Sequence, residues 1–428
     1  MLNKENSLFS ETNGKMLLLI AMSLVLVSHA VIIYFTLSKT YDAFVHIFFA
    51  DHYARFWFEP WEYRWYTGFL TISYPPLVHQ LIALLGKVFP LKVAFSIYAI
   101  FIYEIFIVGI YRFTKMFFNK TTAGVAAILA VVLSSLVETL HVFGQVPTLT
   151  GLGFLLNALP FIYQYIVKRK AIYLIMALSF LAVVVSSHHV TAIFGMVFFI
   201  APTVFMALAD ALPQELKGTK YFIFMWNVLK AAFKKYKEII LLGGLTIALA
   251  VGLIFPYWYW SITDPIAQVS IPHGSRNNFF DYPSSGLVFY VIPLTLIFAL
   301  LPAISHTIIK RRRFFGWAVS FFLCLLLGSG GTTPLPKIIL GANAFNILTL
   351  DRFGFWASII AVPFMAKFIH SFIAGSVKEF WFKNFGSSTH FILSGLSAFS
   401  YILFIVFIFH LGSFRPLQPK EVDIQPIQ

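Results

Sequence analysis

Asp42 and His46 are the two residues whose types and spacing most directly suggest chemistry. They stand four positions apart, so they would share one face of a helix, and they follow the first long apolar run. A carboxylate beside an imidazole at the edge of an apolar run can act as a general base or bind a metal ion. A structural alternative is that Asp42 only caps the start of a helix while His46 faces water.

Aromatic residues dominate the stretch that contains this pair, from 41 to 76. Trp61, Trp65 and Tyr74 belong to the residue types that settle at a membrane–water boundary, with the apolar ring in the membrane and the polar edge in water. We therefore predict that residues 38–90 form a large loop on one face of a membrane, with helices that lie in the interface.

The elements that hold this loop must be membrane-spanning helices. The chain of 428 residues is 59% hydrophobic and 11% charged, whereas soluble domains carry about 25% charged residues. The apolar runs do not alternate as barrel strands do, and several reach the ~20 residues that one helical span needs. The predicted fold is a single all-α polytopic membrane domain, residues 1–428, with about eleven transmembrane helices at 16–37, 91–111, 121–141, 147–167, 171–187, 189–209, 238–257, 286–308, 314–328, 353–374 and 391–411.

Three apolar segments are short for a full crossing. Segments 171–187 and 314–328 would be tilted or partly re-entrant. The run at 77–90 contains Lys87 and Pro90, and we interpret it as an interfacial or re-entrant helix of the first loop. If it crossed, the basic cluster at 112–120 would lie outside, against the positive-inside rule.

Charge predicts the orientation of the chain. With the N-terminus in the cytoplasm, about two thirds of the 31 lysines and arginines lie on the cytoplasmic side, as the positive-inside rule expects. Residues 210–237 would then be a basic cytoplasmic connection with an amphipathic helix attracted to anionic lipid, and residues 258–285 would form a second outer loop. This bias explains the net charge of +14 without nucleic acid. We therefore predict a multi-pass protein of the cell membrane.

The predicted outer side also collects most of the other candidate site residues. They are His141 and Gln145 in one turn, His188 in the next, Arg276 in the second outer loop, and Arg352 at the start of a late helix. Ionisable groups at a membrane edge are costly and by default mark a functional site. An arginine held by Asp351 suits bidentate binding of a phosphate. The alternatives are a snorkelling arginine and a histidine that packs at a helix break.

Several common catalytic motifs are absent from the sequence. It contains no His-Glu-x-x-His motif and no cysteine pair for zinc, and no Gly-x-Ser-x-Gly nucleophile elbow. The glycine-rich stretch 328–334 lacks the lysine of a phosphate-binding loop, so we interpret it as a flexible outer turn.

The motifs together resemble the GT-C superfamily of membrane glycosyltransferases. The matching residues are Asp42 with His46, Trp61, Trp65, Gly68, Tyr74-Pro75-Pro76-Leu77, Phe143-Gly144-Gln145-Val146-Pro147, Ser187-His188 and Asp351-Arg352-Phe353. The resemblance is closest to bacterial and archaeal membrane proteins named as relatives of 6-pyruvoyl-tetrahydropterin synthase, although nothing in the sequence supports a pterin reaction.

The resemblance implies an inverting transfer of a hexose or pentose from a polyprenyl-phosphate donor to an acceptor on the outer face of the cell envelope. The expected partners are the lipid-linked sugar donor and membrane lipid. The expected catalytic residues are Asp42 as base or metal-binding acid, His46 and His188. The expected substrate-binding residues are Arg352, Gln145, His141, Arg276, Trp61 and Tyr74.

Members of this superfamily often carry two adjacent acidic residues in the first loop. Here Ala43 follows Asp42, and Asp51 lies nine positions away. The cofactor is therefore left open, with Asp42 and Asp51 as the candidate ligands of a divalent ion, Mg²⁺ or Mn²⁺.

Two other classes of protein stay open. A transporter or flippase of a lipid-linked saccharide would use the same aromatic and charged face for binding without chemistry. Transporters tend to contain inverted repeats and broken helices at mid-depth, and the sequence shows no repeat. A structural membrane subunit is the third class, and the clustered histidines and carboxylates argue against it.

Overall fold

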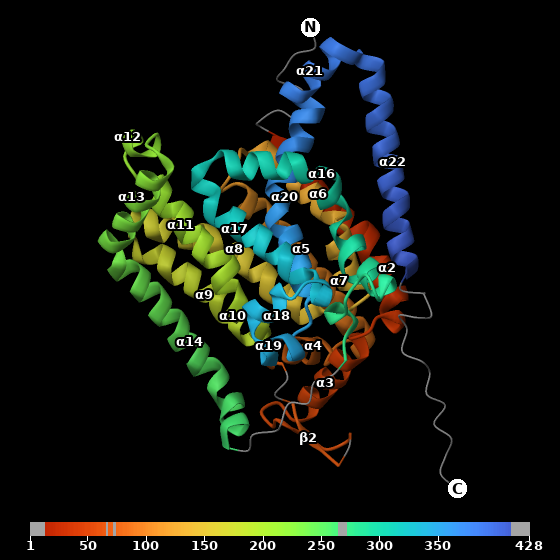
Figure 1. Ribbon diagram of the computed structural model, residues 1–428. Helices are drawn as coiled ribbons and strands as arrows, with labels where there is room; N and C mark the ends of the chain where they lie inside the picture. Colours follow the sequence, from red (N-terminus) through yellow and green to blue (C-terminus); the bar gives the residue numbers. More distant parts are fainter. Residues whose placement is uncertain (1–12, 66, 72–73, 264–271, 412–428) are drawn as a thin grey trace.

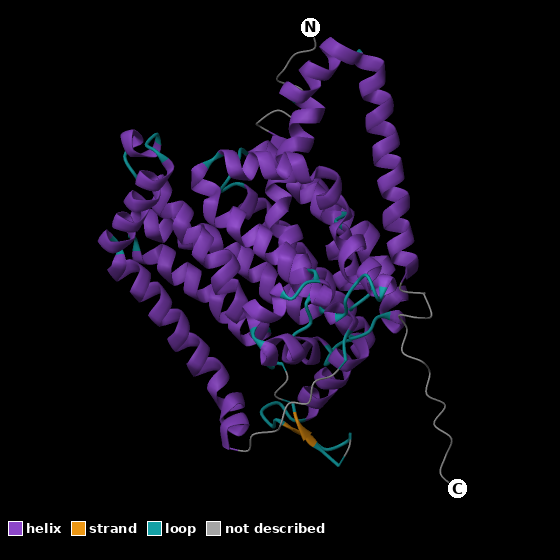
Figure 2. Cartoon of the chain, viewed as in Figure 1, coloured by secondary structure: helices purple, strands orange, loops and turns teal. Residues whose placement is uncertain are grey.

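The computed structural model describes residues 13–65, 67–71, 74–263 and 272–411, and these residues are almost entirely helical (Figures 1 and 2). The α-helices are α1 (Gly14–Leu24), α2 (Ala30–Thr36), α3 (Ala43–Arg55), α4 (Leu77–Leu85), α5 (Leu91–Thr114), α6 (Lys120–Val131), α7 (Ser134–His141), α8 (Val146–Lys168), α9 (Ala171–Ser187), α10 (His189–Gly195), α11 (Ala201–Asp210), α12 (Gln214–Lys217), α13 (Tyr221–Lys234), α14 (Tyr236–Thr263), α15 (Pro283–Gly286), α16 (Ile292–Lys310), α17 (Phe315–Gly328), α18 (Leu335–Leu340), α19 (Ala342–Ile347), α20 (Asp351–Ala374), α21 (Ser376–Phe385) and α22 (Ser387–Leu411). Single π-helical turns are η3 (Val25–His29), η5 (Met196–Ile200) and η7 (Leu287–Val291), and 3-10 turns are η4 (Leu37–Lys39), η6 (Gly274–Arg276), η8 (Arg312–Phe314) and η9 (Gly330–Thr332).

The helix lengths fit a polytopic membrane protein. Within the described residues, eight helical stretches are long and apolar enough to cross a membrane: Gly14–Lys39, Leu91–Thr114, Val146–Lys168, His189–Asp210, Tyr236–Phe255, Pro283–Lys310, Asp351–Ala374 and Ser387–His410. Helices α6 and α7 meet at a bend of 42°, and counted as one broken span they make nine. Helices α9 and α17 are shorter, with 17 and 14 residues. Each predicted span therefore contains helix, and eight or nine have the length of a crossing.

Helix α8 lies at the centre of the bundle, packed against α5, α9 and α11. Small residues let the backbones approach closely: a Cβ on Gly109 of α5 would lie 3.0 Å from the Leu156 Cβ and 3.1 Å from the Gly153 carbonyl oxygen of α8. Such close packing is a main source of helix association in lipid, where the hydrophobic effect does not act between helices. Helices α14 and α22 stand at the outside of the bundle (Figure 1), with only 17% and 11% of their most apolar stretches buried.

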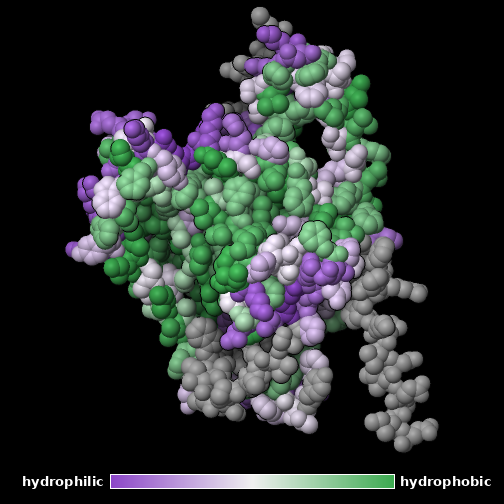
Figure 3. All heavy atoms as spheres, in the orientation of Figure 1, coloured by the Kyte–Doolittle hydropathy of each residue, from purple (hydrophilic) through white to green (hydrophobic). Residues whose placement is uncertain are grey.

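The surface is hydrophobic across the middle of the molecule. Figure 3 shows a largely green face over the central helices, with hydrophilic residues gathered in patches toward the two ends. Exposed large apolar residues such as Phe101, Val251 and Phe399 lie on membrane-length helices. This distribution is the one expected where lipid surrounds the bundle.

At the break between α6 and α7, backbone carbonyl oxygens accept hydrogen bonds from side chains of distant helices. His29 Nε2 lies 2.9 Å from the Val131 carbonyl oxygen, and the Tyr103 hydroxyl donates to the same oxygen at 3.0 Å. The Tyr401 hydroxyl donates to the Val132 carbonyl oxygen at 2.9 Å. A broken helix at membrane depth needs such partners, since lipid offers none. The bend directs α7 and the segment after it toward Asp42.

The first loop contains one element that differs from the all-helical prediction. Between α3 and α4, strands β1 (Trp61–Glu62) and β2 (Phe69–Leu70) pair in an antiparallel hairpin. Gly68 has a φ of +103°, and a Cβ there would lie 2.6 Å from the Trp61 ring. This close contact requires glycine, and it explains why the motif contains Gly68 seven residues after Trp61.

The second predicted outer loop is shorter than expected, because α14 continues to Thr263. Residues 264–271 lie outside the described residues. Beyond them, η6 packs against η9: Gly330 has a φ of +65°, and a Cβ there would lie 2.5 Å from the Ser275 carbonyl oxygen. The glycine-rich stretch 328–334 is therefore a close backbone contact under this loop, rather than the flexible turn that its composition predicts.

The connections that charge assigns to one side of the membrane also meet in space. At one end of the bundle, Arg169 forms an ion pair with Glu238 at 2.8 Å. At the other end, Ser275 Oγ accepts a hydrogen bond from the Leu350 N–H at 2.9 Å. We call the first the basic end and the second the site end. Which end faces the cytoplasm stays a prediction.

Candidate functional site

Asp42 lies at the start of α3 without capping it. Its side chain makes no capping hydrogen bond. The cap comes instead from Thr40, whose hydroxyl oxygen accepts from the Ala43 N–H at 3.2 Å. The capping alternative is therefore wrong for Asp42, and its carboxylate is free to act elsewhere.

The segment before α8 fixes the backbone of Asp42. The N–H groups of Tyr41 and Asp42 donate to the carbonyl oxygens of Val142 and Phe143 at 3.1 and 3.0 Å. Two such bonds hold residues 41–42 beside residues 142–143, which lie about one hundred positions further along the sequence. The Gly-Gln-x-Pro motif thus begins directly after the residue whose carbonyl oxygen holds Asp42.

Gly144 makes this pairing possible. Its φ is +69°, and a Cβ there would lie 2.8 Å from the Thr40 hydroxyl oxygen and 3.0 Å from the Ala43 backbone nitrogen. Only glycine combines this φ with this approach at low cost. Pro147 then stands in the first turn of α8, where its fixed φ suits the helix start.

Arg352 and Asp351 open α20 at the same end of the bundle. The residue before them, Leu350, donates its N–H to Ser275 Oγ, and His273 Nδ1 lies 2.8 Å from the same oxygen. The loop segment that carries His273 and Ser275 therefore fixes the start of α20. Buried atoms of both side chains, Arg352 Nε and Asp351 Oδ1, have no hydrogen-bond partner among the described residues, so each is available to a ligand.

Burial and nearby charges raise the pKa values of Asp42 and Tyr74. Burial raises the pKa of Asp42 to about 6, against the attraction of Arg352 and with a further contribution from Asp351. Burial also raises the pKa of Tyr74 to about 12; the Asp42 charge adds to this rise and the Arg352 charge opposes it. Asp42, Arg352 and Tyr74 therefore lie within electrostatic range of one another, and we call the region around these side chains the shared space of Asp42. Asp42 is mostly ionised there at neutral pH.

His46 is joined to a second buried histidine, His79 of α4. The His46 Nδ1 and the His79 Nε2 are 3.1 Å apart. Burial lowers the pKa of His46 to about 3 and that of His79 well below its usual value, so both rings are neutral, with one nitrogen donating and the other accepting. The Tyr74 ring lies edge-on to His46, with the centroids 5.3 Å apart. The pair thus lies directly beside the shared space of Asp42.

His188 combines a packing role with a place at the site. Its Nδ1 accepts from the Thr191 N–H at 3.3 Å and so caps α10. Its ring stacks on Tyr74, with centroids 6.4 Å apart. Burial lowers the pKa of His188 well below its usual value, and the positive charge of Arg352 adds to this effect. A neutral His188 therefore forms one wall of the space, with only its Nε2 left for a ligand.

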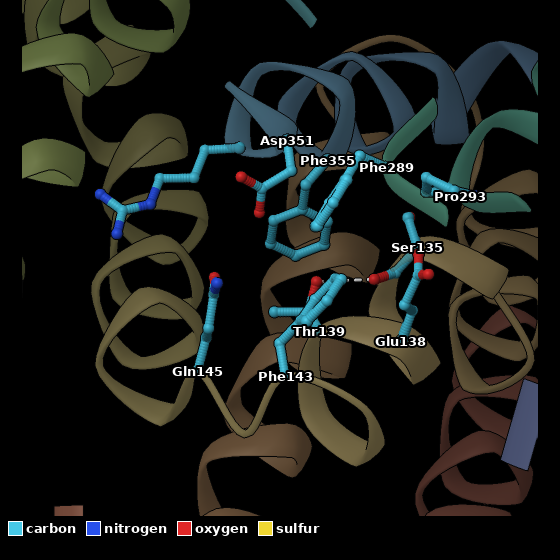
Figure 4. A pocket seen from close by; sticks show the side chains of 10 residues that line it. Ser135, Glu138, Thr139, Phe143, Gln145, Phe289, Pro293, Asp351 and Phe355 are labelled. Atoms are coloured by element: carbon cyan, nitrogen blue, oxygen red, sulfur yellow. Dashed lines mark hydrogen bonds between the residues drawn. The ribbon is translucent and has the colours of Figure 1, made fainter. Parts of the chain in front are cut away.

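A small cavity adjoins Arg352 between α7, α8, α16 and α20. The space open to the centre of a water-sized sphere is about 10 Å³, close to the minimum for one water molecule. Figure 4 shows Asp351 and Phe355 on one side and Thr139, Phe143 and Gln145 on the other. The lining is polar as well as aromatic: Ser135, Glu138, Thr139, Phe143, Gln145, Phe289, Pro293, Asp351, Arg352 and Phe355.

Two predicted site residues lie at the margin of this arrangement. Trp61 is in the hairpin of the first loop and is 36% exposed. Arg276 is partly buried and donates a hydrogen bond to the Asn346 carbonyl oxygen. Burial lowers the pKa of His273; the Asp351 charge opposes this effect, and the charges of Arg276 and Arg352 add to it. Arg276 therefore acts on the same end of the bundle without lining the cavity.

His141 lies apart from the other site residues. Its Nε2 is 2.8 Å from His29 Nδ1, and its Nδ1 is 3.2 Å from the Thr36 hydroxyl oxygen. Both ring nitrogens are therefore occupied by packing between α7 and the first helix. Since His141 does not line the cavity, we leave it out of the proposed site.

Asp51 belongs to an ion network of the hairpin. Its carboxylate pairs with Arg64 and, at 3.1 Å, with Arg55. Arg64 also binds the buried Glu62 at 2.7 Å, and Glu62 lies 3.0 Å from His52. The Arg64 bonds lower the pKa of Glu62 to about 2. Asp51 thus helps to hold the hairpin on α3.

The described residues do not fit the divalent metal site considered from the sequence. The Asp51 carboxylate is engaged by two arginines. No group of three or more His, Cys, Asp or Glu side chains in the described part of the chain is arranged to hold a metal ion. We therefore derive no step through a metal.

Neither His79 nor Glu138 is among the catalytic or substrate-binding residues that the sequence predicts, although His79 is one of the histidines of the predicted outer side. His79 follows the Tyr-Pro-Pro-Leu motif by two positions, and the signal that could have found it is a histidine on the face of α4 that also carries Val78 and Ile82. Glu138 is 2% exposed, lines the cavity, and has an oxygen without a partner among the described residues. In the sequence, Glu138 could have been found as a carboxylate within an apolar run, which marks a candidate functional residue.

Among known proteins, the chain is similar in fold to a solved structure but matches no protein-family model and no curated protein. Among solved structures, the chain is similar to the crystal structure of an Archaeoglobus fulgidus oligosaccharyltransferase in the apo form, with a TM-score of 0.52 and 12% sequence identity. The match covers 95% of this chain and 57% of the other, so the chain spans little more than half the length of that enzyme. At this identity the likeness shows the fold alone.

Proposed function

We propose that this protein is an integral-membrane glycosyltransferase that moves a sugar from a polyprenyl-phosphate donor to an acceptor. The observation that carries the proposal is that Asp42, which follows the first helix, lies within electrostatic range of Arg352, which opens α20 and lines the cavity. An acid and a phosphate-binding cation in one space are what such a transfer needs. The fold shared with an oligosaccharyltransferase supports a sugar transfer, as an analogy of fold.

The proposed reaction exchanges two bonds at the sugar. The bond from C1 to the phosphate oxygen of the donor breaks, and a bond from C1 to the acceptor hydroxyl oxygen forms. Arg352 would balance the charge that grows on the leaving phosphate. Asp42 would accept the proton of the acceptor hydroxyl, which its partly raised pKa allows near neutral pH. Attack opposite the phosphate would invert the configuration at C1.

Neighbouring residues would orient the substrates. Gln145 lines the cavity with Arg352 and offers an amide to sugar hydroxyls. Tyr74 lies between His46 and His188, so its hydroxyl is placed by two stacked or edge-on rings. We propose Trp61 and Arg276 as outlying contacts for the acceptor or the donor, and His46 as an assistant of Asp42.

The orientation of the chain is part of the proposal. We place the N-terminus in the cytoplasm and the site end, with residues 38–90 and 258–285, on the outer face of the cell membrane. Cysteine labelling tests this: in a Cys324→Ser background, Asp281→Cys at the site end should react from outside and Lys230→Cys at the basic end only from inside. Both positions are exposed. The reverse pattern would invert the orientation.

The activity is tested with purified protein and a panel of radiolabelled polyprenyl-phosphate sugars, hexoses and pentoses. Asp42→Asn should abolish transfer and donor hydrolysis while donor binding survives. Asp51→Asn is the matched control, because it makes the same exchange in the first loop at a residue engaged by arginines. Equal turnover in Asp42→Asn and wild type would remove Asp42 from this role. Tight donor binding without turnover in wild type and both variants would favour a carrier of lipid-linked sugars.

The finer family relation is a proposal as well. The motifs around Tyr74-Pro75-Pro76-Leu77 and Gly144-Gln145 resemble those of the membrane proteins named after 6-pyruvoyl-tetrahydropterin synthase. The purified protein can be assayed with the panel of lipid-linked sugars and, separately, with a pterin substrate. The result decides between sugar transfer and the pterin reaction that the family name suggests. We expect turnover of a lipid-linked sugar and none of the pterin.

A further inference from the structure

A second cavity lies at the basic end of the bundle. It has a volume of about 360 Å³ and is lined by Arg112 and Lys115 at the end of α5, Tyr163 and Gln164 near the end of α8, and Arg313 of η8. Gln145 and Tyr163 stand at opposite ends of α8, which at 1.5 Å per residue separates them by ~27 Å. This cavity is therefore distinct from the one beside Arg352.

The cavity has an excess of positive charge. Within the described part of the chain, Arg313 is the one cation of the three that is paired with a carboxylate, that of Asp210, at 3.2 Å. Arg112 donates to the neutral Asn157 side chain at 3.0 Å, and Lys115 lies over the Tyr111 ring. Two positive charges are thus left without a carboxylate among the described residues that contact them.

Neutral groups help to hold the two arginines of the cavity in position. The Arg112 guanidinium lies over the rings of Phe161 and Phe180, at 4.6 and 5.7 Å from their centroids. Arg313 donates to the Met116 carbonyl oxygen at 2.9 Å. An arginine that only marked the cytoplasmic side would extend into water, whereas these two are partly buried and oriented across the cavity.

Two buried polar atoms of the lining still lack partners among the described residues. They are Arg313 Nε, a donor, and Gln164 Oε1, an acceptor. A buried group of this kind costs free energy unless something binds it. A ligand that carries both an anionic oxygen and a hydroxyl would satisfy both atoms.

We infer that this cavity binds a phosphate ester, with its charge on Arg112, Lys115 and Arg313 and a hydroxyl on Gln164. Its place at the ends of two membrane-length helices suits the headgroup of an anionic glycerophospholipid in the leaflet at the basic end. A soluble phosphate ester shares this chemistry. Neither source depends on the sugar-transfer proposal, because none of these residues belongs to the site end.

Native mass spectrometry of the full chain in detergent tests the inference. Wild type should retain phosphatidylglycerol in preference to phosphatidylcholine. Lys115→Gln should weaken this binding about 10-fold, as loss of one charge-assisted hydrogen bond predicts. Lys115 is exposed, so the variant should fold, and its melting temperature without lipid checks this. Lys170→Gln is the matched control, an exposed lysine of the same end that does not line the cavity.

The source of the phosphate is decided by competition. If inorganic phosphate or glycerol 3-phosphate displaces the lipid from wild type, the cavity takes soluble phosphate esters too. If neither displaces it, the lipid headgroup is the ligand. Equal phosphatidylglycerol binding by wild type, Lys115→Gln and Lys170→Gln would overturn the inference, and so would equal retention of the two lipids by wild type.

Discussion

Gly144→Ala is the sharpest test of how the fold positions Asp42. The substituted residue would have to keep a φ of +69°, which costs a non-glycine residue about 1–3 kcal/mol. Its Cβ would also lie 2.8 Å from the Thr40 hydroxyl oxygen and 3.0 Å from the Ala43 nitrogen. Both distances are too short, so the segment that carries Asp42 must move by several tenths of an ångström.

The two effects can be separated by a control at Gly386. That glycine has a φ of +83°, and a Cβ at this position would meet no atom within 4 Å, so Gly386→Ala has the backbone strain without the contact. We expect both variants to lose about 1–3 kcal/mol of unfolding free energy. Only Gly144→Ala should also lose turnover, by about 10- to 100-fold, since small misplacements of a catalytic group cost that much.

The assay is transfer or hydrolysis of a radiolabelled polyprenyl-phosphate sugar, with thermal unfolding measured on the same samples. If Gly144→Ala loses stability as Gly386→Ala does but keeps its turnover, the pairing of residues 41–42 with 142–143 does not position Asp42. The Gly-Gln-x-Pro motif would then have no role in placing Asp42.

Three further predictions follow from the ionisation and bonding of single side chains. Turnover should rise with pH through about 6, because ionised Asp42 is the proposed proton acceptor and burial raises its pKa to that value; a flat rate from about pH 5 to 8 would refute this. His79→Phe should lower the unfolding free energy by about 1–3 kcal/mol, because His46 Nδ1 loses its buried partner, and unchanged thermal unfolding would mean that the pair contributes nothing. Glu62→Gln should lower the unfolding free energy by about 1–3 kcal/mol at neutral pH. The Arg64 bonds lower the pKa of Glu62 from 4.5 to about 2, so the stabilisation by ionised Glu62 is complete above pH 4.5 and declines as the pH falls toward 2. The difference in unfolding free energy between wild type and variant should disappear there.

The helical spans could be predicted because lipid imposes a strong and local rule. Each run of apolar residues has to satisfy its backbone within itself, and every predicted span contains a helix. The hairpin at Trp61–Leu70 could not be predicted in this way. It depends on a glycine at positive φ under a tryptophan ring and on the pairing of Glu62 with Arg64, and neither contact has a periodic signature.

The site residues were predictable as types but not as contacts. Asp42, Gln145 and Arg352 stand out because polar groups are rare at such places in an apolar chain. The sequence could not tell that His141, four residues before Gln145, turns its ring toward His29 instead. Nor could it tell that the Asp51 carboxylate is engaged by arginines, because the partner of a side chain is set by tertiary packing.

The assembly of the site explains why residues that touch no substrate belong to its motifs. Asp42 is placed by a backbone pairing that requires Gly144, and Arg352 is placed by a helix start that Ser275 holds. Ser275 in turn is packed against Gly330. The acid and the cation are thus held at the same end of the bundle by close backbone contacts that two glycines allow. A change at either glycine should therefore separate Asp42 from Arg352 while both side chains remain chemically intact.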